Sequence, residues 1–274
     1  MIELPEAANL ARQLRQVAAG RVVDDVAVGH TPHRFAWFQG DPNAYPGRWR
    51  GRPIGDATHH GGFVVLEIGE APLAVAEGVA LRWCPPGSPR PTRHQLLLTF
   101  GDGAALAAAV GLYGFLLAVV EGEAENPYLA RAREAPAPWS AAFDESYWTA
   151  LVRGVPPKTP LKALLASEQR IPGFGNGVLQ DVLFEARLHP RRRVASLNDG
   201  ESERLWLALR TVLTDMARHG GRVTERDLFG EPGGYATRMT KRAAGGPCPR
   251  CGASIVAESF LGGTVVVCPA CQPR

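Results

Sequence analysis

The sequence lacks the features that mark membrane and secreted proteins. Its 274 residues include no apolar run of about 18, the length that a helix needs to cross a membrane. No basic and apolar leader opens the chain. Only five residues are cysteine, and in a reducing cytosol these favour thiols or metal ligands over disulfides. We therefore expect a cytoplasmic protein without a membrane partner, and the length allows two domains, each with its own core.

Lysine is scarce, and the basic residues are unevenly spread along the chain. Only three of the 30 basic residues are lysine, which a GC-rich coding bias explains as well as function does. Residues 1–130 carry 10 Lys/Arg and 13 Asp/Glu, a net charge of −3, whereas residues 131–274 carry 20 and 14, a net charge of +6. A basic half suits a polyanionic partner, and a solvated basic face explains the same charge equally well.

The first 122 residues read as a β-sandwich with a flanking helix. An amphipathic helix over Pro5–Ala19 ends at Gly20. Turn residues then separate short β runs, and the apolar stretch Gly111–Val120 closes this domain. The predicted strands are Val22–Val28, Arg34–Phe38, Gly62–Ile68, Leu73–Ala76, Val79–Trp83 and His94–Phe100.

The remaining residues read as helices followed by a small finger. Residues 123–138, rich in proline, alanine and charge, are predicted to be a linker. A helical domain over 139–243 would contain helices at Asp144–Arg153 and Glu201–His219, and residues 244–274 would form the finger. The predicted fold class is α+β.

The stretch Leu161–Pro190 predicts two helices around a glycine-rich corner. Pro172 ends the first helix, and Gly173, Gly175 and Gly177 permit the positive φ values of a tight double turn. The second helix would expose unpaired backbone N–H groups at its start, which can bind an anion. Such a corner serves plain packing as well as phosphate binding, and the residues alone leave both interpretations open.

Four of the five cysteines form two C-x₂-C pairs that bracket sixteen residues. This spacing brings four thiolates to one tetrahedral centre and predicts one structural Zn²⁺ with no open coordination position. So short a hairpin cannot bury a core, so metal binding would supply its folding free energy. The predicted ligands are Cys248, Cys251, Cys268 and Cys271.

The G-x-G-N corner, with Lys162 upstream and L-H-P at its end, resembles the helix–two-turn–helix motif of the formamidopyrimidine-DNA glycosylase and endonuclease VIII family. The cysteine finger matches the C-terminal part of the same family. The resemblance implies that Lys162 and Asn176 contact the DNA backbone on either side of a lesion in double-stranded DNA. Gly175, Arg170 and Tyr113 complete the DNA contacts that we expect. A monomeric, nucleoid-associated repair protein is implied.

The N-terminus both resembles the family and departs from it. The family opens Met-Pro-Glu-Leu-Pro-Glu, and its exposed proline amine attacks the sugar carbon to form a Schiff base. Here Ile2 replaces that proline, and a bulky second residue blocks removal of Met1, so the free amine would belong to Met1. Glu3 is retained, and in the family it protonates the sugar ring oxygen. Glu3 and the Met1 amine are therefore the candidate catalytic groups, although Glu3 could instead merely place charge near a helix N-terminus.

Other family positions also differ. The family lysine after the first hairpin falls at Gly62, and the hairpin arginine of the finger falls at Gly263. The three side chains that fill the gap left by an everted base align near Glu77, near Gly111 or Leu112, and at Tyr113. Only Tyr113 could stack as the family residue does. Histidines are further weak candidates for proton transfer, more often structural than chemical: His30, His33, His59 and His60.

Two functions of different classes fit this pattern. The first is a base-excision DNA glycosylase that flips a damaged nucleotide between its domains, with the AP lyase step weak or absent. The second is a non-catalytic protein that keeps the clamp and the finger to bind damaged DNA. Retention of Glu3 favours the enzyme, and loss of the proline, lysine and arginine favours the binding protein.

Overall fold

A single seven-stranded sheet forms the first half of the chain, which the computed structural model describes from residue 1 to residue 274. The strands follow the order β1-β6-β7-β5-β4-β3, with every neighbouring pair antiparallel, and β2 adds to β7 in parallel. The strands are β1 (Val23–Val28), β2 (Ala36–Phe38), β3 (Ile54–His60), β4 (Phe63–Ile68), β5 (Leu73–Cys84), β6 (Leu96–Phe100) and β7 (Ala105–Ala118).

The two central strands are longer than the sequence pattern predicts. The runs at 73–76 and 79–83 are one strand, β5, with a bulge at Gly78 where the register with β7 shifts. Glu77 has a positive φ of 66° at this bulge. The apolar stretch after Gly111 continues β7. Strand β3 was not predicted because its seven residues include only two buried ones.

Helix α1 (Leu4–Val17) covers the sheet and buries Leu10 and Leu14 in the larger core. Helix α2 (Tyr45–Trp49), preceded by a 3₁₀ turn at Pro42–Ala44, closes the same core. Helix α3 (Pro127–Glu134) lies inside the interval 123–138 that composition predicted to be a linker. Its Leu129 packs in a smaller core with side chains of β4, β5 and β7, which explains why this polar segment is ordered.

The second half is helical and carries a two-stranded hairpin. A separate core forms between α4 (Glu145–Arg153), α5 (Leu161–Ala166), α6 (Asn176–Glu185) and α7 (Asp199–Arg218), with 3₁₀ turns at Val194–Ser196 and Lys241–Ala243. The hairpin of β8 (Val256–Phe260) and β9 (Gly263–Val267) packs on α6 through Gln180, which binds the backbone of Thr264 and Val266. The α+β class, the flanking helix, the helical part and the finger hairpin are confirmed.

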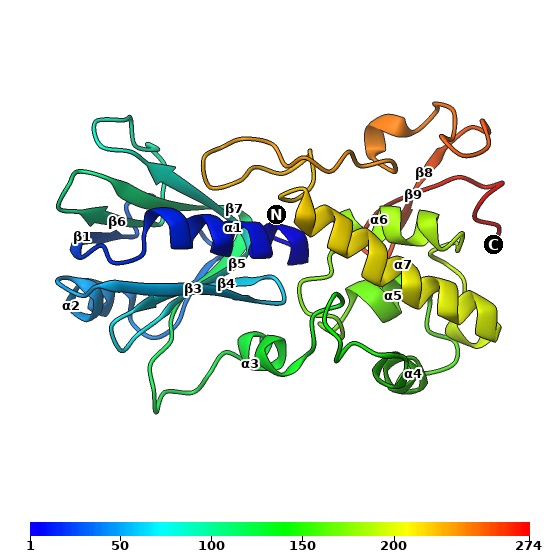
Figure 1. Ribbon diagram of the computed structural model, residues 1–274, viewed down its shortest axis with the longest axis horizontal. Helices are drawn as coiled ribbons and strands as arrows, with labels where there is room; N and C mark the ends of the chain where they lie inside the picture. Colours follow the sequence, from blue (N-terminus) through cyan, green and yellow to red (C-terminus); the bar gives the residue numbers. More distant parts are fainter.

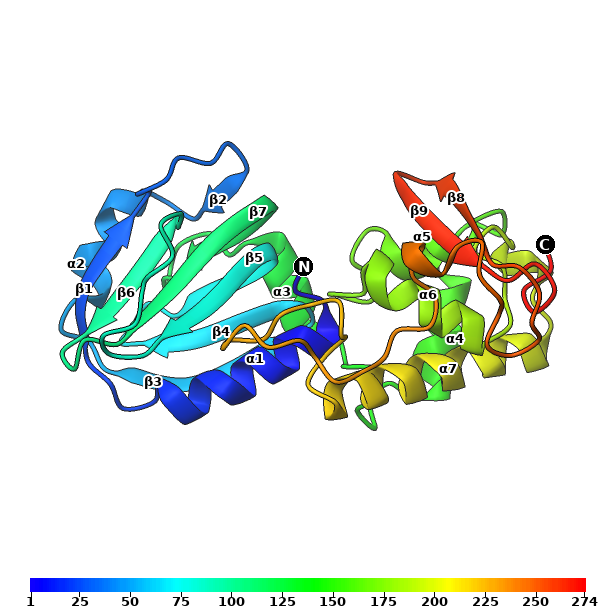
Figure 2. The same ribbon diagram turned by 90° about the horizontal axis from the view of Figure 1, so that it is seen from above.

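The two halves meet at the N-terminus (Figure 1). Residues 220–240, here called the strap, run from the end of α7 back over the first half, where Leu228 enters the larger core and bonds Trp83 and Gln13. Figure 2 shows the β2–β7 end of the sheet and the β8–β9 hairpin projecting on the same side, with the N-terminus between them. No helix is long and apolar enough to span a membrane.

Candidate functional site

The anion at the start of α6 is a carboxylate of the protein itself. Glu3 is 4% exposed, and its two carboxylate oxygens accept hydrogen bonds from the backbone N–H groups of Gly177 at 2.9 Å and Val178 at 2.8 Å. A negative charge at this end of a helix satisfies its unpaired donors and is favoured by the helix dipole. The backbone donors that the sequence predicted at this corner are thus bonded within the fold, by Glu3.

Two of the glycines in the corner are required because other side chains approach their backbone closely, and not because of unusual backbone angles. Only Gly173 has a positive φ, 76°, whereas the sequence interpretation expected it at all three. A Cβ at Gly175 would lie 2.5 Å from Glu3 Oε1, and one at Gly177 would lie 2.8 Å from the same oxygen and 1.5 Å from Arg222 Nη1. Side chains at these positions would displace the Glu3 carboxylate from the helix.

A buried arginine of the strap joins Glu3 to a second carboxylate. Arg222, 2% exposed, donates to Glu6 through Nε and Nη2, each at 2.9 Å, and its Nη1 lies 3.4 Å from Glu3 Oε2. Burial raises the pKa of Glu3, although Arg222 and the two backbone donors oppose the rise. Burial also acts to raise the pKa of Glu6, but the charge and hydrogen bonds of Arg222 hold it below its usual value.

The N-terminal amine lies at the edge of this cluster. Ile2 is 5% exposed in the larger core, and its N–H donates to the carbonyl of Glu77 at 2.7 Å. Because Ile2 is fixed in this way, the amine one residue upstream extends to the strap, where the Met1 ammonium pairs with Glu225. Glu225 Oε1 in turn lies 3.9 Å from Arg222 Nη2. A cavity of about 370 Å³ opens here, lined in part by Met1, Ile2 and residues 224–227.

Three positions expected at the DNA backbone converge at the tip of the finger hairpin. Lys162, nearly buried, donates from Nζ to the carbonyl of Phe260 at 2.6 Å, and Asn176 Nδ2 donates to the carbonyl of Thr264 at 2.9 Å. A Cβ at Gly263 would lie 3.1 Å from Lys162 Nζ. Residues 88 and 98 positions apart along the chain thus form one polar group, in which Lys162 supplies the cation.

The other expected DNA contacts lie apart from this group. Arg170 is held within the corner, where Nη1 donates to the carbonyl of Ala163 at 2.9 Å and Nη2 pairs with Glu168. Tyr113 is exposed at the β2–β7 end of the sheet, and the half-buried Glu77 lies in the strand that pairs with β7 there. Glu77 accepts a hydrogen bond from Gln169 at 3.3 Å.

The four predicted zinc ligands meet in the finger. Their sulfur atoms all lie within 4.8 Å of one another, with Cys248 and Cys271 3.9 Å apart and Cys251 and Cys268 3.5 Å apart. Four thiolates on one Zn²⁺ at about 2.3 Å are separated by about 3.8 Å, so the cluster fits a tetrahedral zinc site. The family model described as a zinc finger found in FPG and IleRS matches residues 245–274. The finger is a structural zinc site with four cysteine ligands.

Comparison of the whole sequence decides the family. The chain is 32% identical over 287 residues to the formamidopyrimidine-DNA glycosylase of Thermus thermophilus, covering 99% of this chain and 98% of the relative. The corresponding protein of Symbiobacterium thermophilum is 30% identical over 280 residues, covering 100% and 90%. The chain belongs to the formamidopyrimidine-DNA glycosylase family.

Solved structures of the family share this fold. The crystal structure of the MutM (Fpg) protein from Thermus thermophilus matches with a TM-score of 0.81 and 29% identity, over 98% of each chain. The Lactococcus lactis Fpg in complex with DNA containing an abasic site matches with a TM-score of 0.83 over 99% of this chain and 100% of that one, at 22% identity. The second similarity concerns the fold alone.

The structure explains one departure from the family pattern. The family lysine falls at Gly62, and a Cβ there would lie 2.9 Å from Gly173 Cα. The β3–β4 turn thus packs its backbone against the glycine corner and leaves no room for a side chain. Nearby His59 packs on Trp139, and burial lowers its pKa to about 4. His59 is therefore neutral near neutral pH, as a structural histidine would be.

Two of the remaining histidine candidates have side-chain contacts within the fold. His30 stacks on His94, and His33 Nε2 bonds the carbonyl of Gly111 at 3.0 Å. Burial lowers the pKa of His60. None of these rings contacts Glu3 or Met1 through a hydrogen bond.

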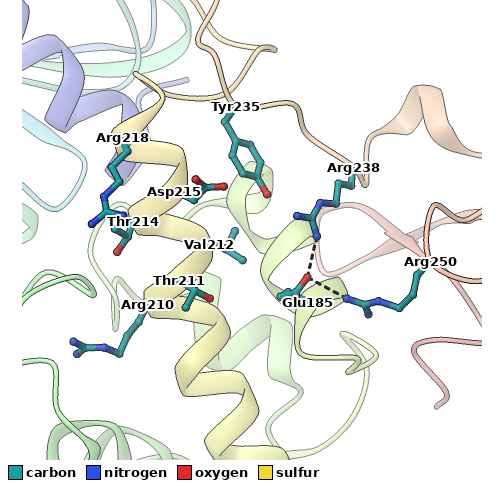
Figure 3. Close-up of a pocket in the computed structure, with 10 residues that line it drawn as sticks. All are labelled: Glu185, Arg210, Thr211, Val212, Thr214, Asp215, Arg218, Tyr235, Arg238 and Arg250. Carbon is teal, nitrogen blue, oxygen red and sulfur yellow. Dashed lines mark hydrogen bonds and ion pairs between the residues drawn. The ribbon is translucent and has the colours of Figure 1, made fainter.

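A larger cavity, about 800 Å³, lies along α7, and side chains of Glu185, Tyr235, Arg238 and Arg250 also line it (Figure 3). Arg238 and Arg250 converge there on one carboxylate, Glu185, at 2.9 and 3.0 Å. Its lining includes none of the candidate catalytic or DNA-binding residues. The larger of the two cavities is therefore not the one that the candidate catalytic residues line.

Sequence reasoning missed the strap residues of the site. Arg222 and Glu225 stand in the segment GGRVTER, which follows the last predicted helix and carries no recognised motif. The glycine pair at 220 and 221 was the sequence signal that a new segment begins after the helix. Both glycines have positive φ in the structure, where they begin the strap. Nothing in the local sequence shows that Arg222 crosses to residues more than 200 positions away.

Proposed function

We propose that this chain is a DNA glycosylase that removes damaged bases from duplex DNA, with an AP lyase step that is weak or absent. The observation that carries the proposal is the position of Glu3. Its carboxyl group is buried at the start of α6, joined through Arg222 and Glu225 to the N-terminal amine. Burial raises the pKa of this carboxyl group, and a carboxyl group held near the DNA sugar can act as a general acid or base.

The surrounding residues support a duplex partner. Lys162 and Asn176 lie at the tip of the finger hairpin, on the side of the molecule where the N-terminus and the β2–β7 end of the sheet also project (Figure 2). Related proteins of known structure have been crystallised with DNA that contains an abasic site or carbocyclic 8-oxo-G. We infer that Lys162 and Asn176 bind phosphates, that Gly175 and Arg170 support the corner between them, and that a monomer suffices.

The N-terminal geometry is the basis for a weak lyase step. Lyase chemistry in the family needs a free amine at the sugar. With Met1 retained, the nitrogen of Ile2 is an amide nitrogen, which is not nucleophilic and whose hydrogen is donated to the carbonyl of Glu77. The Met1 amine is primary, and its ion pair with Glu225 must break before it can attack. A hydrolytic path, in which Glu3 assists opening of the sugar and water completes base release, makes no use of that amine.

A non-catalytic damaged-DNA-binding protein is the second candidate. One observation favours it: the Glu3 carboxylate is fully engaged by two backbone donors and a guanidinium. A group with this many partners has a structural role even without chemistry, since it caps α6 and ties the two halves of the chain together.

Base release from a lesion panel distinguishes the two candidates. Duplexes carrying oxidised purines or oxidised pyrimidines are incubated with the wild type, Glu3→Gln and Glu6→Gln. The glycosylase proposal predicts base release that is lost in Glu3→Gln and retained in Glu6→Gln, because Glu6 shares Arg222 but does not touch α6. Tight binding to damaged duplex with no base release across the panel would instead establish the binding protein.

A further inference from the structure

Basic side chains line the larger of the two cavities, which the proposed glycosylase reaction does not use. This cavity of about 800 Å³, here called the α7 cavity, lies between α7, the end of α6, the strap and the zinc finger (Figure 3). Four of the ten residues that line it are arginine and two are acidic, so its lining carries a net positive charge suited to an anion. The arginines are Arg210, Arg218, Arg238 and Arg250.

The carboxylate of Glu185 shows how an oxyanion is held in this cavity. Arg238 Nη1 lies 2.9 Å and Arg250 Nη2 3.0 Å from the same oxygen, Glu185 Oε2, and Figure 3 shows both guanidinium groups directed at it. Arg250 is fixed in this position, because its Nη1 also donates to the carbonyl of Phe184 at 2.8 Å. One carboxylate neutralises only one of the two guanidinium groups, so a positive charge remains at this end of the cavity.

The arginines of α7 add positive charge that no ion pair neutralises. Arg210 donates from Nη1 to the carbonyl groups of Ser140 at 3.1 Å and Phe143 at 2.6 Å, which are uncharged acceptors. Arg218 is exposed, and its guanidinium makes no hydrogen bond or ion pair in the structure. Basic side chains therefore stand on both sides of the cavity.

The remaining lining favours phosphate groups over an apolar ligand. Val212 and Tyr235 are its only apolar residues, and at 6% and 5% exposure they offer a partner little to pack against. Thr211 and Thr214 add hydroxyl groups to the wall. An oligophosphate places several charges in a row, each with acceptor oxygens for a guanidinium fork, and so matches several arginines better than one carboxylate does. The volume is within the range of about 300–1,000 Å³ that is typical of small-molecule sites.

The α7 cavity is separate from the residues proposed to bind duplex DNA. Its lining includes neither Lys162 nor Asn176. Figure 2 shows α7 on the side of the molecule opposite to that where the β8–β9 hairpin and the β2–β7 end of the sheet project. A ligand in the cavity and a duplex at the tip of the hairpin therefore use different residues.

We propose that the α7 cavity binds an oligophosphate, a chain of two or more phosphate groups. Arg238 and Arg250 bind one phosphate in place of Glu185, and Arg210 and Arg218 bind others along α7. The phosphates belong either to a free nucleotide or to the backbone of a single nucleic-acid strand, since both offer the same oxyanions to the arginines. The proposal does not rest on the proposed glycosylase activity.

Calorimetric titrations with adenosine triphosphate and with a short oligothymidylate test the cavity. Each titration is made with the zinc-loaded protein, both free and saturated with undamaged duplex. We expect saturable binding of at least one probe that the duplex does not displace. Arg238→Gln and Arg218→Gln should each weaken it about 10-fold or more, because each removes a charge-assisted hydrogen bond. Arg204→Gln is the matched control, since Arg204 is exposed on α7 but does not line the cavity, and it should change the affinity little.

Glu185→Gln should change the affinity in the opposite direction. It frees Arg238 and Arg250 from their carboxylate, so both probes that bind the wild type should bind this variant more tightly. Damage to the fold does not produce tighter binding, so this gain separates a binding site from a structural ion pair. Binding of the nucleotide alone identifies a free nucleotide as the ligand, and binding of the oligothymidylate alone identifies a nucleic-acid strand.

Three results would overturn the proposal. The first is absence of saturable binding of either probe, and the second is binding that all these variants leave unchanged. The third is binding of an oligoglutamate peptide in place of both probes, because the cavity would then select carboxylates of a protein partner. Displacement of both probes by undamaged duplex would likewise contradict a separate site.

Discussion

Replacing Arg222 by methionine tests the buried cluster that joins the two halves of the chain. Methionine keeps the length and apolar stem of the side chain but removes the charge. Glu6 then loses two hydrogen bonds of 2.9 Å, and Glu3 loses its cation at 3.4 Å, while both carboxyl groups stay buried. Removing one partner of a buried ion pair costs about 3–5 kcal/mol, so the free energy of unfolding should fall by that amount near neutral pH.

The decrease in the free energy of unfolding should be smaller at lower pH. Arg222 opposes the burial that raises the pKa of both carboxyl groups, so in the variant both folded-state pKa values lie above the unfolded value of about 4.3. A raised folded-state pKa means tighter proton binding by the folded protein, so the variant gains stability as pH falls toward that value. In the wild type, the lowered pKa of Glu6 contributes stability that is present above about pH 4.3 and is lost below it.

Urea unfolding of both proteins at about pH 7.5 and about pH 5 measures the difference, which should be smaller at the lower pH. Arg15→Met is the matched control, because Arg15 pairs with Asp56 in solvent and its loss should leave stability nearly unchanged. A decrease below about 1 kcal/mol for Arg222→Met would show that Arg222 does not form a buried ion pair, since breaking such a pair costs more. A decrease that is the same at both pH values would show that Arg222 does not alter the pKa of the two carboxyl groups.

Two further predictions concern zinc and DNA. Purified protein should contain about one Zn²⁺ per chain by elemental analysis, and Cys248→Ser or Cys271→Ser should release it and weaken DNA binding; normal binding by metal-free protein would contradict this. Lys162→Ala and Asn176→Ala should each weaken duplex binding in titrations without changing sequence preference. Lys162→Ala should also lower the salt slope by about one, and unchanged binding in both variants would show that the corner only packs.

Local patterns in the sequence predicted the parts of the fold that depend on neighbouring residues. The spacing of the cysteines predicted the zinc finger, because its four ligands lie in two tight turns and the site depends little on residues elsewhere in the chain. The glycine-rich corner predicted where one helix ends and where α6 begins. Strand β3 and helix α3 were missed, since their order comes from packing against distant strands and their own patterns are mostly polar.

The candidate site was predictable only in part, for the same reason. Lys162 and Asn176 were named from one motif, but their contacts with the finger hairpin at Phe260 and Thr264 were not predicted. The partner of the α6 N-terminus could not be predicted, because Glu3 lies 174 positions from Gly177. Arg222 likewise reads as a surface cation in the sequence, and only the fold shows that it is buried between two carboxylates.

Borohydride trapping under single-turnover conditions shows whether an amine of the protein attacks the sugar. A Schiff base between the protein and the opened sugar is reduced to a stable adduct, which is compared with the base released from the same duplex. Ile2 is bonded through its N–H and Met1 is paired with Glu225, so we predict base release with little or no adduct, and loss of release in Glu3→Gln. An adduct formed in proportion to the released base would contradict this account, because an amine of the protein would then perform the lyase step.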